Sequence, residues 1–124
     1  MKDVNFISEF HKDILHIYDS LFGMNFYFVK ARTEKEFVSK IKPLIDIPLR
    51  ENSENAVGSF RVINYDCFLW GYKPEDIAHE CFHATHHVMK NAGIPLNNDT
   101  SEVYAYHLQF LMREIFRPKK GSKK

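Results

Sequence analysis

The sequence has few cysteines, no charge excess and no long apolar run. Only 2 of its 124 residues are cysteine, which excludes a disulfide-rich secreted fold. The 17 Lys and Arg residues balance 16 Asp and Glu residues, so the net charge of +1 gives no general attraction to nucleic acid or an anionic membrane. No segment approaches the roughly 20 apolar residues of a membrane span, and the N-terminus lacks the apolar core of a signal peptide. We therefore expect an intracellular, cytoplasmic protein with no membrane or nucleic-acid partner, and no pattern indicates an oligomeric state.

Length and composition predict one domain. With 44% hydrophobic and 15% aromatic residues, the chain can bury a core without support from metal or disulfides. We place this domain at residues 1–116. The last eight residues, 117–124, hold five basic residues and no acidic one, which predicts a solvated, disordered tail.

Hydrophobic spacing predicts a mixture of helices and strands. Apolar residues three or four apart favour a helix from Phe6 to about Leu21, ended by Gly23. A buried strand is predicted over 24–29 and a capped helix over 33–42.

The second half of the chain carries clearer signals. Residues 43–58 have the Pro, Asn and Gly content of a loop, with at most one short strand. Two strand-like runs, 59–64 and 67–72, predict a hairpin whose first strand lies at a sheet edge. Helices are then predicted from Pro74 to about Asn91 and from about Asp99 to Phe116.

His79, Glu80 and His83 form an H-E-x-x-H motif inside the predicted helix over 74–91. At about 100° per residue, the two histidines lie about 40° and one turn apart, so both imidazoles can bind one zinc ion. Glu80 lies beside the pair, where it can hold a metal-bound water rather than the metal. The other histidines of this helix and Lys90 share the motif's face, and the apolar residues lie on the opposite arc. We predict one Zn²⁺ per chain.

A catalytic zinc site needs a third protein ligand and an open fourth position. Glu102 follows His83 after 18 intervening residues and lies in the first turn of the next predicted helix. If the two helices pack antiparallel, Glu102 would lie close to the metal. His86 and His87 are nearer in sequence but lie on the same rigid helix, which places them poorly for a tetrahedral site. Residues 99–102 also match a capping box, in which Glu102 would only cap its own helix. We expect Glu102 to be the ligand, with capping as the alternative.

These residues resemble the gluzincin zinc metallopeptidases, whose motif is H-E-x-x-H with a downstream glutamate as third ligand. The 18-residue gap is similar to that of the aminopeptidase N group and one residue short of thermolysin-like enzymes, and the resemblance covers residues 58–116. It implies that residues 1–116 form a single α+β, zincin-like domain, with a small mixed β-sheet packed on helices that include the H-E-x-x-H helix. The metzincin pattern does not fit, because it requires a glycine at His86 and a histidine at Met89.

The resemblance implies a metallopeptidase in which Glu80 is the general base for a metal-activated water. Many thermolysin-like enzymes have an Asp four residues after the glutamate ligand. This chain has Tyr106 there, which we expect to face the site and to assist catalysis. A peptide or protein substrate is expected to add to the edge strand and to contact Phe60, Val62 and Asn64.

Other functions fit parts of the sequence. A catalytically silent zinc-binding module for protein interaction or regulation would keep the metal site, and its effect would survive Glu80→Gln. A zinc hydrolase of a non-peptide amide would carry the same motif, and a nucleic-acid binder would rest on the basic tail alone. Cys81 falls on the packed arc of its helix, so we expect a buried thiol rather than a ligand.

Overall fold

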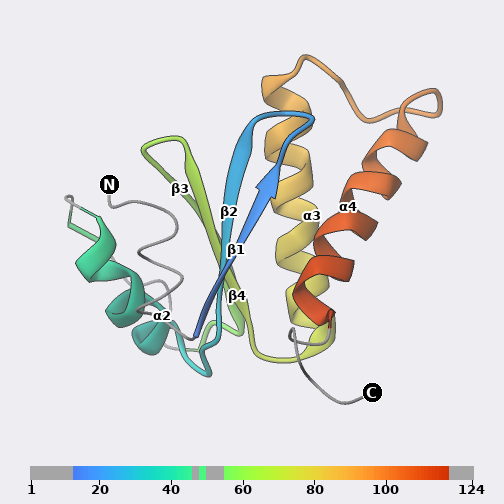
Figure 1. Cartoon of the computed structure of the whole chain (residues 1–124). Helices are drawn as coiled ribbons and strands as arrows, with labels where there is room; N and C mark the ends of the chain where they lie inside the picture. Colours follow the sequence, from blue (N-terminus) through green and yellow to red (C-terminus); the bar gives the residue numbers. More distant parts are fainter. Residues whose placement is uncertain (1–12, 46–47, 50–54, 118–124) are drawn as a thin grey trace.

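A computed structural model describes residues 13–45, 48–49 and 55–117. These residues form a four-stranded mixed sheet packed against three α-helices (Figure 1), which confirms the α+β class. The strands are β1 (Ile14–Asp19), β2 (Met24–Val29), β3 (Gly58–Ile63) and β4 (Asp66–Gly71). The helices are α2 (Glu34–Ile41), α3 (Pro74–Asn91) and α4 (Ser101–Phe116), with a 3₁₀ turn, η1 (Lys42–Leu44), after α2.

The strand order in the sheet is β1-β2-β4-β3. The pair β2–β4 is parallel, whereas β1–β2 and β3–β4 are antiparallel hairpins. The predicted hairpin is therefore confirmed, and β3 lies at a sheet edge as expected. Asn64 and Tyr65 form its two-residue turn with φ values of 51° and 70°, the left-handed conformation of a type I′ turn.

The sheet separates two cores. In Figure 1, α3 and α4 cover one face and α2 covers the other. Successive residues of β2 and β4 point to opposite faces, and most of them are buried, because both faces of the central strands are covered. Phe26 and Leu69 pack under α3, whereas Tyr27 and Trp70 pack under α2. Cys81 is buried in the α3 core, as predicted.

The prediction of a helix up to Leu21 is wrong for residues 14–19, which form β1. Ile14 and Ile17 are three residues apart, a spacing that fits a helix face, but here they enter the two different cores. Pairing with β2 along six residues favours the strand, and both isoleucines are β-branched. Gly23 ends no helix: it lies in the β1–β2 turn with φ of 68°. Residues 1–12 lie outside the described part.

Helices α2 and α3 begin and end as their sequence signals predict, whereas α4 begins at Ser101, two residues later than predicted, and its N-cap residue Thr100 makes no side-chain capping hydrogen bond. The Thr33 hydroxyl accepts a hydrogen bond of 3.1 Å from the Glu36 backbone N–H and caps α2. Pro74 begins α3, and the Asp76 carboxylate accepts a 3.0 Å hydrogen bond from the backbone N–H of the preceding lysine. Gly93 ends this helix with φ of 75°.

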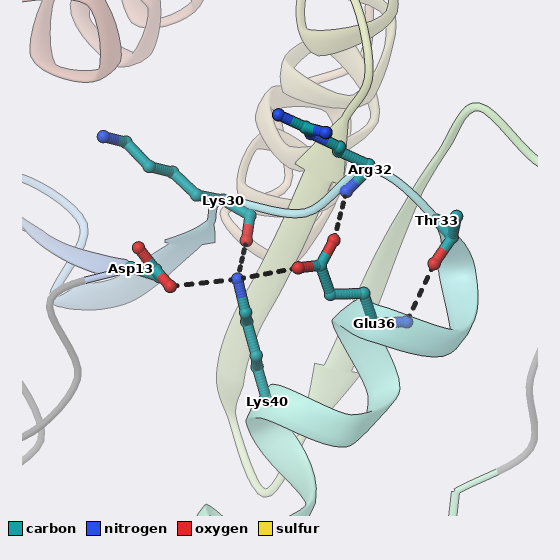
Figure 2. Close-up of polar contacts among 6 residues, drawn as sticks. All are labelled: Asp13, Lys30, Arg32, Thr33, Glu36 and Lys40. Carbon is teal, nitrogen blue, oxygen red and sulfur yellow. Dashed lines mark hydrogen bonds and ion pairs between the residues drawn. The ribbon is translucent and has the colours of Figure 1, made fainter.

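Lys40 ties α2 to the ends of β1 and β2 (Figure 2). Its ammonium group lies 3.0 Å from Asp13 and 3.3 Å from Glu36, and it donates a 2.6 Å hydrogen bond to the Lys30 carbonyl. Glu36 also accepts a 2.7 Å hydrogen bond from the Arg32 backbone N–H. Partial burial lowers the pKa of Lys40, but its hydrogen bonds to Asp13 and Glu36 outweigh burial and raise the pKa overall.

No helix in the described ranges is long and apolar enough to cross a membrane. The predicted basic tail lies outside these ranges from residue 118 onward, as do residues 46–47 and 50–54 of the predicted loop.

Candidate metal site and cleft

His79 and His83 lie together on the exposed side of α3. Their Nε2 atoms are 3.2 Å apart, and their ring centroids are 4.8 Å apart. Two nitrogens bound to one tetrahedral zinc at 2.0–2.1 Å would be separated by about 3.3 Å. The helix therefore already holds both nitrogens at the spacing that a shared zinc ion needs.

The Glu80 side chain reaches the edge strand β3 at Gly58, and only 8% of the residue is exposed. A Cβ atom at Gly58 would lie 3.0 Å from the Glu80 Oε2 atom, so the glycine leaves the space that the carboxylate occupies. Burial raises the pKa of Glu80. Its neighbour His79 opposes this rise, while Glu34 and Asp76 add to it. Within the described ranges, no group donates a hydrogen bond to this carboxylate.

A cleft of about 490 Å³ runs between β3 and α3. Phe60 forms part of its wall and packs against the His87 ring, with 5.8 Å between centroids. The cleft thus lies between the edge strand that was predicted to bind substrate and the helix that carries the H-E-x-x-H motif. Its lining residues are Gly58, Ser59, Phe60, Glu80, His83, His86, His87 and Lys90.

A buried histidine sets the position of α4. His107 pairs through Nδ1 with the Thr85 hydroxyl on α3 and through Nε2 with the Asp19 carboxylate on β1, both at 2.8 Å. Asp19 in turn accepts hydrogen bonds from the backbone N–H groups of Leu21 and Phe22. These contacts fix the register between α3 and α4.

That register holds Glu102 away from the histidine pair. Because His107 is level with Thr85 in this antiparallel pair, Glu102 is level with about Lys90, seven residues beyond His83. Seven residues correspond to about 10 Å along a helix axis. Glu102 is exposed, and the structure does not bring it to His79 and His83. Among the residues described, no three His, Cys, Asp or Glu side chains are grouped to hold a metal ion.

Tyr106 also lies away from the cleft, in contrast to the prediction. It is 66% exposed and lines a separate apolar groove of about 460 Å³ between α4 and the β1–β2 turn. Glu102 is one helical turn away from Tyr106 and so shares its side of α4. The α3–α4 contact through Tyr104 and His107 turns that side away from the histidine pair.

Of the three residues predicted to contact substrate, only Phe60 lines the cleft. Val62 is 42% exposed on the same face of β3, but it lies beyond the cleft lining. Asn64 lies in the hairpin turn and not in the strand, because the pairing ends at Ile63.

Sequence reasoning assigned no role to Gly58 or Lys90, both of which line the cleft. Lys90 could have been found, since the helical wheel places it with the histidines. Gly58 could not, because its role depends on how closely β3 approaches α3. Comparisons of the chain with protein-family models, curated proteins and solved structures find no match.

Proposed function

We propose that this protein is a gluzincin-type, zinc-dependent metallopeptidase with a zincin-like fold. The observation that carries the proposal is the 3.2 Å separation of the His79 and His83 Nε2 atoms beside the buried carboxylate of Glu80. Its setting adds support, because all three side chains lie on the helix that forms one wall of a cleft whose other wall is an edge strand.

His79 and His83 would hold the zinc ion, which lowers the pKa of a bound water and polarises a substrate carbonyl. Glu80 would accept the proton of that water and return it to the leaving amine. The outer edge of β3, which pairs with no further strand in the described ranges, would bind an extended peptide through backbone hydrogen bonds.

The third zinc ligand rests on sequence spacing alone. We propose Glu102, whose exposed side chain makes no hydrogen bond or ion pair within the described ranges. Because about 10 Å of helix separates its level from that of His83, a side-chain rotation is not enough, and the start of α4 would have to move toward the ion. His86, in the same cleft, is the competing ligand.

Zinc content per chain tests the site. We expect about one zinc in the wild type, measured by atomic emission on protein purified without added metal, and loss of zinc in His83→Ala and Glu102→Ala. His16→Ala, on β1, is the matched control and should keep its zinc. Zinc retained in Glu102→Ala but lost in His86→Ala would assign the third ligand to His86. A wild type that binds no zinc even after replenishment would disprove the proposal.

Glu80→Gln tests the chemistry separately from the metal. The variant should keep its zinc and lose peptide hydrolysis by at least 100-fold, since general base catalysis contributes about that much. Hydrolysis that continues unchanged would show that Glu80 is not the base.

A second candidate function is a zinc-binding module without turnover. It is favoured by one observation, that the described residues contain no three-residue metal group. Under this alternative, zinc binds to the wild type, but no peptide in a mixed-sequence library is cleaved.

A further inference from the structure

The cleft is electrostatically asymmetric along its length. Glu80 is the one carboxylate among its lining residues, at the Gly58 end. At the other end lie His86, His87 and Lys90, with no acidic side chain among them. Glu102, at a similar level on α4, does not line the cleft, and Lys90 has no ion-pair partner in the described ranges. Partial burial lowers the pKa of His87, as do the charges of Lys90 and His86.

The cationic end lies at a definite distance from the proposed reaction site. Glu80 and Lys90 are ten residues apart on α3, which is about 15 Å along the helix axis. An extended peptide advances about 3.3 Å per residue, so about four residues cover that distance. Phe60 lies along this path opposite His87 and would contact the residues between.

We infer that the cleft selects substrates with a carboxylate about four residues from the bond that is cleaved, held by Lys90. This inference rests on the proposed peptidase function and names its substrate class. Lys90 is the specificity residue, because its ammonium group lies at this end of the cleft. The carboxylate can come from an Asp or Glu side chain or from the C-terminus of the peptide.

A peptide series with matched variants tests the inference. The probes are ten-residue quenched fluorescent peptides with an amidated C-terminus, in which one Asp or one Asn is moved through each position. A second series keeps Asn and ends in a free carboxylate four residues after the cleaved bond. The proteins are zinc-loaded wild type, Lys90→Glu and the control Lys35→Glu, whose exposed lysine lies on α2 across the sheet.

We expect kcat/KM to be about fivefold higher for the best Asp peptide than for its Asn partner, the size of one exposed charge pair, and to fall with salt. Lys90→Glu should abolish this preference and favour a Lys peptide instead, whereas Lys35→Glu should keep it. A preference for the free C-terminus over the side chain would identify that source of the carboxylate. Equal cleavage of Asp and Asn peptides, or equal effects of the two Lys variants, would overturn the inference.

Binding without turnover separates this inference from the function on which it rests. Fluorescence anisotropy of labelled Asp and Asn peptides with the Glu80→Gln protein should show the same fivefold difference in Kd. If no peptide is cleaved but this difference appears and Lys90→Glu removes it, the peptidase proposal fails and the carboxylate site stands. If peptides are cleaved without an acidic preference, the inference fails and the peptidase stands. If no peptide binds, both fail.

Discussion

Two buried glutamates lie on opposite sides of the first residues of β3, and their surroundings differ. Glu34, on α2, is 1% exposed and accepts hydrogen bonds from the Ser59 hydroxyl at 3.1 Å, the Trp70 indole at 2.8 Å and the Arg61 guanidinium. Glu80, on α3, is also buried, but it faces an open cleft and accepts no hydrogen bond from the residues described. A carboxylate that accepts several internal hydrogen bonds stabilises the fold, whereas one that faces a cleft is available to water and substrate.

The largest effect is expected for Glu34→Ala. It leaves the Arg61 charge and the Trp70 N–H without their acceptor and should lower the free energy of unfolding by about 3–5 kcal/mol in urea titrations. Glu80→Gln, on the other face, should not lower stability, because the amide keeps the shape and removes a buried charge. A loss below about 1 kcal/mol in Glu34→Ala would show that the network contributes little.

Gly58→Ala should disturb the position of the Glu80 carboxylate in the cleft. The new Cβ would lie 2.9 Å from the Trp70 carbonyl oxygen and 3.0 Å from the Glu80 carboxylate, so both must shift. We expect a loss of about 1–3 kcal/mol in stability, together with reduced peptide hydrolysis.

Gly71→Ala is the control for this substitution, because the atoms that its Cβ would meet first belong to the backbone of Ile77, at 2.5 Å, and of Asp76, at 2.8 Å. It should lower stability while sparing the hydrolysis rate measured at a temperature where both variants are folded. Equal rates in the two variants would show that Gly58 is needed only for folding.

The reactivity of the Cys81 thiol, next to Glu80 in the sequence, tests whether solvent reaches the core behind the cleft. Burial raises the pKa of Cys81 to about 12, and the Glu80 carboxylate adds to the rise. The Cys67 thiol, also raised to about 12 by burial, lies in the same core. Neither thiol should react with iodoacetamide in folded protein at pH 8, as followed by mass spectrometry, and both should react in urea. Rapid alkylation of Cys81 alone would mean that the cleft extends behind Glu80.

The smallest effect is expected for Glu36→Gln, which removes the charge of a carboxylate whose side chain is 41% exposed. The hydrogen bond from the Arg32 backbone N–H is the main cause that lowers the pKa of Glu36 below its ordinary value of 4.5. Because the folded-state pKa is lowered, this stabilisation is present above that ordinary value and is lost as the pH falls through the folded-state pKa. Wild type should exceed the variant in stability by no more than about 0.5 kcal/mol at pH 7, and thermal melts should show this difference shrinking as the pH is lowered below 4.5.

The site was predictable from the sequence only where it depends on a single element. The motif helix has the predicted bounds, and its period alone places His79 and His83 together. The hairpin and its edge strand also followed from local turn and strand signals. The helix predicted up to Leu21 failed over residues 14–19, because Ile14 and Ile17 serve two cores that exist only after β1 pairs with β2.

The sequence by itself therefore determined the H-E-x-x-H face, the α+β class and the edge position of β3, since helical period, capping and hairpin turns act between near neighbours. Only the tertiary structure decided that Gly58 makes room for Glu80 and that Glu102 and Tyr106 lie away from the histidines. The physical reason is that contacts between distant residues set the packing of α4. His107 reaches Thr85, 22 residues away, and Asp19, 88 residues away, and no local pattern encodes such pairs.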